Sequence, residues 1–256
     1  MRNISRYPHP LLAAVAFTGL LTACGDPPKP AGPIPVTTIP APYVVQDRPL
    51  VIVLPGRSDD LGDLKQAGIA ASVQRAWPEA DVELAGATLG YYLHGDVALE
   101  LHDQIIAPAR ARGYRQIWLT GASLGGMGVL LYEKAYPHDV TGLVLMAPYM
   151  GEPALVNEIM NAGGPTHWNP GPTPTKLDDK DYQRGLWQLV KSWGGRPDEA
   201  RRIWLICGSG DRFIGAAKLI ATQLPPEHFI HVAGGHDWPY WDAGAEQAFT
   251  HIAAGN

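Results

Sequence analysis

The stretch that decides the fold is TGASLGGMG at 120–128, in which Ser123 has a glycine two residues to either side. An apolar run at 117–119 precedes it. In a tight turn from strand to helix, side chains two residues before and after the turn residue would collide, and Gly121 and Gly125 remove them. Such a turn presents the hydroxyl beside the free N–H groups that start the next helix. The stretch therefore predicts a nucleophilic serine at the end of a buried strand.

Strand-like and helix-like segments alternate along the rest of the chain. Short apolar runs typical of buried strands lie at 50–54, 81–85, 115–120, 142–147, 202–207 and 229–232. Helical patterns lie at 61–77, 95–112, 124–136, 216–224 and 240–254. Pro108 lies inside the second of these helices and predicts a kink there. Because strands that alternate with helices form crossover units, we expect a mostly parallel sheet with helices on both faces.

Two later loops carry the groups that would activate the serine. A serine hydroxyl is a weak nucleophile, so it needs a base to accept its proton and a carboxylate to orient that base. In an open parallel sheet, sites lie at the carboxyl ends of the strands. The strand at 202–207 leads to Asp211, and the strand at 229–232 leads to His236. We therefore predict that Asp211 and His236 meet Ser123.

These three motifs resemble the α/β-hydrolase superfamily, in particular its small carboxylesterase and lipase-like members. The resemblance rests on the elbow 121–125 and on the loops 208–212 and 234–238. The order Ser, Asp, His along the chain agrees with it. It implies an α/β-hydrolase fold and a catalytic triad of Ser123, His236 and Asp211, with no metal and no cofactor.

The resemblance also implies two backbone N–H groups that bind the oxyanion. One is the N–H of Leu124, and the other is that of Arg57 in the loop after the first core strand. Superfamily members often have His-Gly where this chain has Pro55-Gly56, so the path of this loop stays open. The Arg57 side chain is expected to be solvated, with an anionic group of the substrate as its alternative partner.

Other titratable residues near these loops are predicted to be structural or exposed. The histidines in this group are His94, His102, His228, His231 and His251. Asp237 follows His236 directly, so its side chain should point elsewhere. The carboxylates expected at a solvated helix start, with a contact to substrate as the alternative, are Asp178, Asp179 and Asp181.

An insert at about 149–198 interrupts the alternation of strands and helices. It is rich in glycine and proline at 163–174, and a helix is predicted at 178–193. Long inserts in compact domains are usually functional, so we expect a small cap over the site, with a surface decoration as the alternative. Trp168 and Trp187 suggest an apolar acyl or aryl subsite, or else core packing.

Residues 1–23 have the pattern of a secretory signal, with two arginines before an apolar run at 11–21 that is too short to span a bilayer. The ending Leu-Thr-Ala-Cys24 resembles the bacterial lipobox, which implies that Cys24 is lipidated. An ordinary cleaved signal is the alternative. By the same resemblance, Gly25 after the cysteine favours the outer membrane, with the protein facing the periplasm.

The segment 24–48 is predicted to be a linker outside the fold. Seven prolines between 25 and 42 favour extended geometry over helix or sheet. The hydrolase domain is therefore expected over 49–256, with the cap insertion inside it.

Composition limits the partners. Lys and Arg number 20 against 25 Asp and Glu, and removal of the two arginines in 1–23 would change the formal net charge from −5 to −7. This charge argues against nucleic acid as a partner, because phosphate backbones require a basic face. After Cys24 only Cys207 remains, so no internal disulfide is available to the domain.

Together these features predict a lipid-anchored serine hydrolase of the cell envelope that cleaves small carboxylic esters with short to medium chains. Thioester hydrolysis, acyl transfer and peptide hydrolysis use the same residues and stay open as alternatives. A non-catalytic envelope binding or scaffold module is a further alternative. The oligomeric state also stays open.

Overall fold

The computed structural model describes residues 30–94, 96–171 and 182–255. Its centre is a seven-stranded sheet with the strand order β1-β3-β2-β4-β5-β6-β7. The pair β1 and β3 is antiparallel, and every other neighbouring pair is parallel. The predicted mostly parallel sheet is therefore confirmed. The predicted signal segment and Cys24 lie outside the described residues.

The strands follow the apolar runs of the sequence. They are β1 (Val36–Ile39), β2 (Leu50–Leu54), β3 (Asp81–Ala85), β4 (Ile117–Ala122), β5 (Gly142–Met146), β6 (Ile203–Gly208) and β7 (Phe229–Val232). Every residue of β2 to β6 is buried. Continuous burial is expected of parallel strands with helices on both faces, and it explains why their sequences do not alternate between apolar and polar residues.

The edge strand β1 corrects the prediction that 24–48 lies outside the fold. Its four residues, Val36–Ile39, pair with β3 and are β-branched, and prolines at its ends are tolerated on an edge strand. Ile34 is buried, and the Tyr91 hydroxyl donates to the carbonyls of residues 32 and 33 at 3.1 and 3.0 Å. The packed chain therefore begins earlier than predicted.

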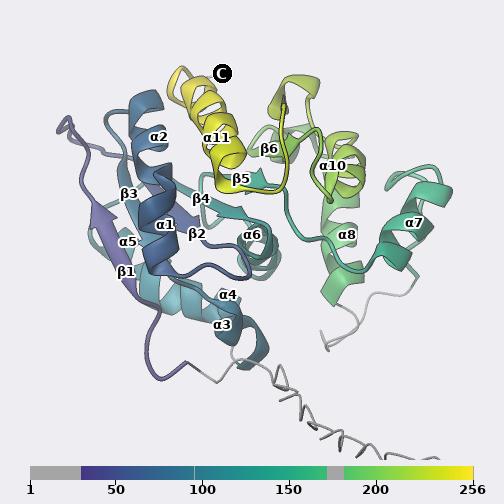
Figure 1. Cartoon of the computed structure of the whole chain (residues 1–256), viewed down its shortest axis with the longest axis horizontal. Helices are drawn as coiled ribbons and strands as arrows, with labels where there is room; N and C mark the ends of the chain where they lie inside the picture. The colour runs from purple at the N-terminus through teal and green to yellow at the C-terminus, as the bar shows by residue number, and fades with distance from the viewer. Residues whose placement is uncertain (1–29, 95, 172–181, 256) are drawn as a thin grey trace, which may run out of the picture.

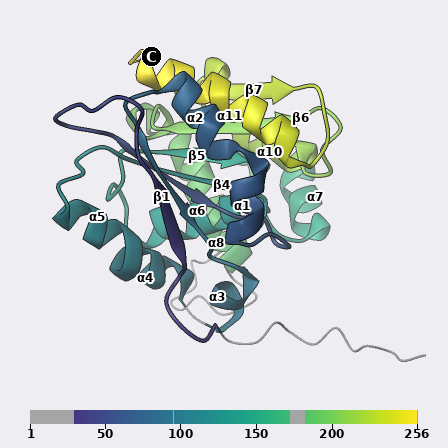
Figure 2. The same cartoon turned by 60° about the vertical axis from the view of Figure 1, so that its left-hand side comes forward.

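Helices cover both faces of the sheet (Figures 1 and 2). One face carries α1 (Leu61–Ala67), α2 (Ile69–Ala76) and α11 (Trp238–Ala253), which contact one another. The opposite face carries α4 (Val97–Leu101), α5 (Ala107–Ala111) and α6 (Leu124–Ala135). Two further helices follow directly from loops at strand ends. One is α3 (Leu89–His94), which precedes α4, and the other is α10 (Ile214–Ala221), which packs on β6.

Two predicted helices are divided in the structure. The helix predicted at 61–77 breaks at Gly68, which has a φ of 84° and so ends α1 in the left-handed region that glycine tolerates. The helix predicted at 95–112 contains a π-helical turn, His102–Ile106, between α4 and α5. Pro108 has no N–H to donate, and the wider turn just before it accommodates the ring.

In the described part of the insert the helices are α7 (Pro153–Asn161), α8 (Tyr182–Trp193) and α9 (Pro197–Ala200). Two of these helices pack on the rest of the domain, α8 against α6 and α7 against α10. Trp168 and Trp187 are buried, and their indole N–H groups donate to a Glu158 carboxylate oxygen and to the Met150 carbonyl at 2.8 and 2.9 Å. These two hydrogen bonds therefore join segments of the insert to one another. Asp178, Asp179 and Asp181 lie outside the described residues.

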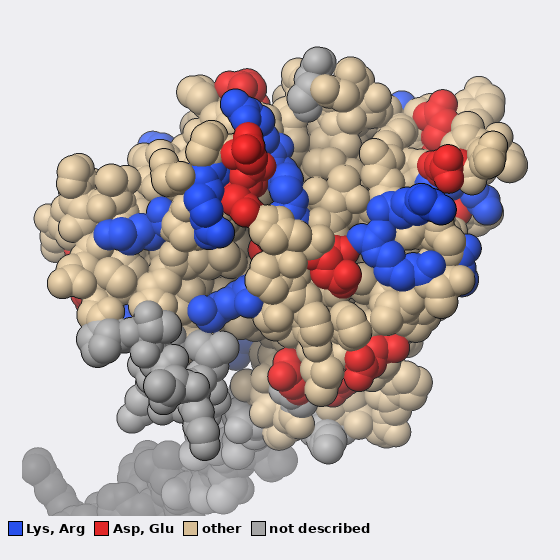
Figure 3. Space-filling model, turned by 180° about the vertical axis from the view of Figure 1, so that it is seen from behind, with Lys and Arg blue, Asp and Glu red and all other residues tan. Residues whose placement is uncertain are grey.

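The surface carries interleaved charges. On the face seen in Figure 3, basic and acidic side chains lie in mixed groups. Exposed ion pairs such as Arg75–Glu246 and Arg184–Glu158 contribute little to stability, because water screens the charges. Among the described helices, none combines the length and the apolar character that a membrane crossing requires.

Candidate active site

Ser123 lies in the turn between β4 and α6. Its φ of 54° and ψ of −109° are strained for a residue with a side chain. Its N–H donates to the Met146 carbonyl at 2.8 Å, and its carbonyl accepts from the N–H groups of Met127 and Tyr149 at 3.2 and 2.9 Å. These bonds hold the strained turn at the carboxyl end of the sheet.

The glycines around Ser123 allow backbone segments to touch. A Cβ atom on Gly121 would lie 2.4 Å from the carbonyl carbon of Gly125. A Cβ atom on Gly125 would lie 2.6 Å from the carbonyl oxygens of Leu54 and Pro55. Backbone atoms cannot swing aside as a flexible side chain does, so both positions require glycine. The start of α6 is thereby pressed against the loop that follows β2.

His236 lies between Ser123 and Asp211. Its Nε2 is 2.9 Å from Ser123 Oγ, and its Nδ1 is 2.9 and 2.8 Å from the two carboxylate oxygens of Asp211. An ionised carboxylate only accepts, so Nδ1 donates to Asp211 and Nε2 is left to accept the serine proton. The three residues, which are far apart in sequence, therefore meet as the chain order predicted.

The surroundings of His236 fix both the ring and its carboxylate. The Asp211 side chain is fully buried, and one of its oxygens accepts the Phe213 N–H at 2.7 Å. The rings of Phe213 and Trp241 meet the imidazole edge-on, with centroids 4.9 and 4.8 Å away.

Burial next to Asp211 also raises the pKa of the Cys207 thiol to about 12, which keeps that thiol protonated at neutral pH.

The two predicted oxyanion donors, Leu124 and Arg57, both line the pocket that contains Ser123. Within the described chain, neither backbone N–H donates to a protein acceptor. The neighbouring Gly56 N–H, by contrast, donates to Asp59 Oδ2 at 3.1 Å. Both amides are therefore available to a ligand, and their assignment as oxyanion donors stays a prediction.

Ser123 opens into a pocket of about 1010 Å³. Three side chains of α6, Leu124, Met127 and Leu131, line the pocket along one side of that helix. The whole helix is about 18 Å long at 1.5 Å per residue. Tyr149 and Glu152 from the insert line one wall. The insert therefore borders the pocket, whereas the two buried tryptophans proposed for an apolar subsite are absent from its lining.

The other wall is one that sequence reasoning missed. It comes from α3 and the start of α4, and its apolar members are Leu89, Tyr92, Leu93 and Val97. The Tyr92 hydroxyl is buried without a hydrogen-bond partner in the described chain, and this burial raises its pKa. The apolar, aromatic run at 89–93 is the signal in the sequence that could have indicated this wall.

The remaining histidines have other surroundings. His228 is buried, stacks on Trp204 and places Nδ1 3.0 Å from the Ile203 carbonyl, while His251 stacks on the same indole. His94 and His231 are exposed, and His102 contacts Asp103. Asp237 points away from the site and accepts the Trp238 N–H as the cap of α11.

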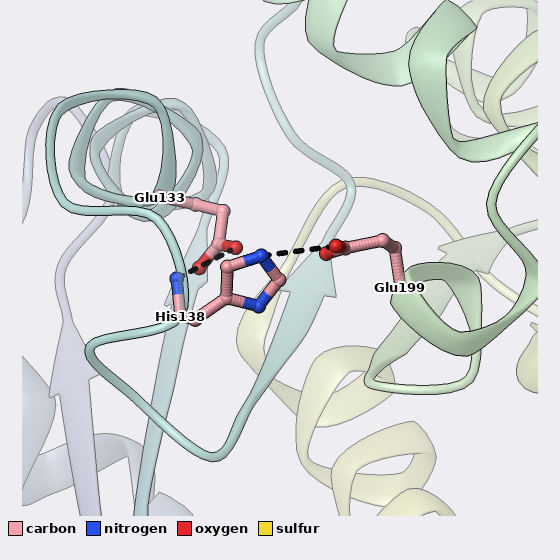
Figure 4. Close-up of side chains that lie close together, drawn as sticks. All are labelled: Glu133, His138 and Glu199. Atoms are coloured by element: carbon pink, nitrogen blue, oxygen red, sulfur yellow. Dashed lines mark hydrogen bonds and ion pairs between the residues drawn. The ribbon is translucent and has the colours of Figure 1, made fainter.

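One group of side chains among the described residues has the spacing of a metal site, namely Glu133, His138 and Glu199 (Figure 4). His138 Nε2 lies 2.9 Å from a Glu199 oxygen. Arg202 donates to Glu133 at 3.0 Å and lies 2.9 Å from His138 Nδ1 and 3.4 Å from Glu199. This guanidinium supplies the positive charge that a cation would bring, so the group fits an ion-pair network that ties α6 to α9.

No protein-family model matches the sequence, and no curated protein matches it. Solved structures do match. The substrate-bound fluorophosphonate-binding serine hydrolase F of Staphylococcus aureus superposes with a TM-score of 0.56 at 15% identity over 87% of this chain and 99% of that one. S-formylglutathione hydrolase of the same species superposes with a TM-score of 0.54 at 15% identity, over 82% of this chain and 83% of that one. Est1E of Butyrivibrio proteoclasticus with bound ferulic acid superposes with a TM-score of 0.53 at 14% identity, over 87% of this chain and 95% of that one. The chain therefore has the α/β-hydrolase fold.

Proposed function

We propose that this chain is a serine hydrolase that cleaves carboxylic esters of small molecules through an acyl-enzyme intermediate. The observation that carries the proposal is the position of the His236 imidazole, with one nitrogen on Ser123 Oγ and the other on the Asp211 carboxylate. The fold supports it, because proteins that share the fold are named as a ferulic acid esterase, an S-formylglutathione hydrolase and a serine hydrolase.

In the acylation half, Ser123 Oγ attacks the ester carbonyl carbon while His236 Nε2 takes the hydroxyl proton. The Asp211 carboxylate stabilises the imidazolium that forms. The carbonyl oxygen becomes an oxyanion, which the N–H groups of Leu124 and Arg57 bind. When the carbonyl re-forms, the ester C–O bond breaks and His236 returns the proton to the departing alcohol oxygen.

In the deacylation half, a water molecule takes the place of the alcohol. His236 removes one of its protons as the oxygen attacks the acyl carbon, and then gives that proton to Ser123 Oγ as the acid leaves. Ser123 is thereby restored, and the net reaction converts the ester and one water molecule into an acid and an alcohol.

A fluorophosphonate probe tests this proposal, because it reacts only with a serine that has been activated as a nucleophile. We expect the wild type to be labelled and Ser123→Ala to be unlabelled, with loss of p-nitrophenyl ester hydrolysis in the same variant. Absence of labelling in a folded wild type would support a binding or scaffold module instead. Panels of thioesters, peptides and acceptor alcohols then separate ester hydrolysis from its alternatives.

We also propose that Cys24 carries lipid and tethers the domain to the envelope, facing the periplasm from the outer membrane. The packed chain starts near residue 32, so the tether at 25–31 spans at most about 25 Å when fully extended. The pocket would then work close to a membrane surface. We expect the wild type to incorporate a palmitate analogue and to sediment with membranes, and Cys24→Ser to do neither. A wild type that is soluble and unlabelled would indicate an ordinary cleaved signal.

A further inference from the structure

Three arginines of the described chain have side chains that donate to no carboxylate and no backbone carbonyl. They are Arg57, Arg115 and Arg212, and each of the other described arginines has such an acceptor. Acidic residues outnumber basic ones in this protein, so acceptors for these cations are not scarce. Two of the three, Arg57 and Arg212, line the pocket that contains Ser123.

Arg57 and Arg212 reach this pocket from the two loops that border the candidate active site. Arg57 follows the loop that touches the start of α6, and Arg212 directly follows Asp211. The Arg212 guanidinium carbon lies 5.0 Å from the centroid of the Phe213 ring, which is itself 4.9 Å from the His236 ring. Arg212 is therefore within about 10 Å of the imidazole and is held at the pocket by a cation–π contact.

The carboxylates of the same pocket already have hydrogen-bond donors. Asp96 caps α4 and accepts the N–H groups of Ala98 and Leu99, both at 3.1 Å. Glu152 accepts the Tyr149 hydroxyl at 3.0 Å. Among the charged side chains of the described pocket lining, the unmatched ones are thus cationic, and guanidinium groups are well suited to bind carboxylate or phosphate.

We infer that the ester hydrolysed at Ser123 carries an anionic group, a carboxylate or a phosphate, which Arg57 and Arg212 bind while the serine attacks. This inference rests on the proposed hydrolase function and adds the charge of the substrate to it. For Arg57 it favours the alternative given by the sequence, an anionic group of the substrate, over a solvated side chain.

Matched ester pairs test the inference. Mono-4-nitrophenyl adipate and 4-nitrophenyl hexanoate have acyl chains of equal length and differ in a terminal carboxylate. The acetyl esters of 3-hydroxybenzoate and 3-hydroxybenzamide place the same difference on the alcohol side. We expect the wild type to prefer the anionic member of at least one pair by about tenfold or more in kcat/KM, which is the scale of a hydrogen bond to a charged group. The pair that shows this preference identifies the side of the ester that carries the charge.

The ratio within each pair is the readout, because general damage to the enzyme cancels in it. Arg212→Gln and Arg57→Gln should move the ratio toward one, and added salt should do the same. Arg115→Gln is the matched control, since it removes a similarly unpaired arginine that does not line the pocket, and it should leave the ratio at the wild-type value.

Equal rates for both members of both pairs in the wild type would overturn the inference, as would a ratio that neither pocket variant changes. In either case, loss of neutral-ester hydrolysis in Ser123→Ala would leave the hydrolase proposal intact. Persistence of that hydrolysis in Ser123→Ala would instead remove the proposed function itself.

Discussion

Trp238 donates its indole N–H to the Asp59 carboxylate across 2.9 Å, and the oxygen that accepts it, Oδ2, also accepts the Gly56 N–H at 3.1 Å. Trp238 is two residues after His236, and Gly56 is adjacent to Arg57. A single carboxylate oxygen therefore joins the loop of the proposed oxyanion donor to the start of the helix that follows the histidine. Asp59 thus acts as a positioning residue for the loop and does not reach the pocket itself.

Replacement of Asp59 should therefore affect rate more than substrate binding. In Asp59→Ala we expect kcat to fall by about ten- to a hundredfold with little change in KM, because an oxyanion donor acts mainly in the transition state and its loss costs up to about 3–4 kcal/mol. Steady-state kinetics on a neutral ester measures this. Asp63→Ala is the control, since the Asp63 carboxylate accepts the Asp60 N–H at the start of α1 and makes neither of the bonds of Asp59 to Gly56 and Trp238. A rise in KM at constant kcat would contradict the positioning role.

The sheet and the meeting of Ser123, Asp211 and His236 could be predicted because local signals point to them. Strands buried on both faces require unbroken apolar runs, and the parallel arrangement forces loops after successive strands to the same edge. The glycines at 121 and 125 are required by contacts between backbone atoms, so they appear in the sequence as a motif.

The walls of the pocket could not be predicted in the same way. Tyr92 on α3 lies against Gly128 on α6, and α4 packs on the same helix. These contacts between segments have no local signature in the sequence. Trp168 and Trp187 are rich in apolar surface, which suits a core as well as a pocket, and tertiary packing placed them in the core. The edge strand β1 was missed because the prolines that flank it indicate a linker, although an edge strand tolerates them.

Removal of the imidazole tests the assignment of the base. We expect His236→Ala to lower kcat by at least about a thousandfold, in line with typical losses when one member of such a triad is removed. His231→Ala is a suitable control, because this exposed histidine lies on β7, the strand that leads to the same loop. If His236→Ala retained near-normal activity, another group would have to be the base.

Asp242 on α11 should make stability depend on pH. Burial raises its pKa to about 7, against a partial opposing effect of Arg75, and its Oδ1 has no partner in the described chain. Because the folded pKa is above the ordinary value near 4, the folded state retains a proton that the unfolded state has lost between about pH 4 and pH 7. Stability therefore falls as the pH rises through this window, and the full penalty is present above it.

Asp242→Asn removes this titration. A rise of about three pKa units corresponds to about 4 kcal/mol, and solvent screening of the partly exposed carboxylate reduces this by about half. We therefore expect the variant to be more stable than the wild type by ~2 kcal/mol at about pH 8, with the difference shrinking toward zero near pH 4. Urea unfolding at several pH values measures the difference. A variant that is less stable than the wild type at pH 8 would mean that Arg75 stabilises the charged form more than burial disfavours it.

The elbow itself can be tested at Gly125. A methyl group there would meet two backbone carbonyl oxygens at 2.6 Å, so Gly125→Ala must push α6 away from the loop after β2. We expect the free energy of unfolding to drop by about 1–3 kcal/mol, the usual cost of overpacking, and kcat to drop as the Leu124 N–H moves. Gly195→Ala is the control, because a Cβ there would meet no atom within 4 Å and should change stability by less than about 0.5 kcal/mol. Equal thermal midpoints for the two variants would show that the contact between the elbow and the loop is looser than these distances imply.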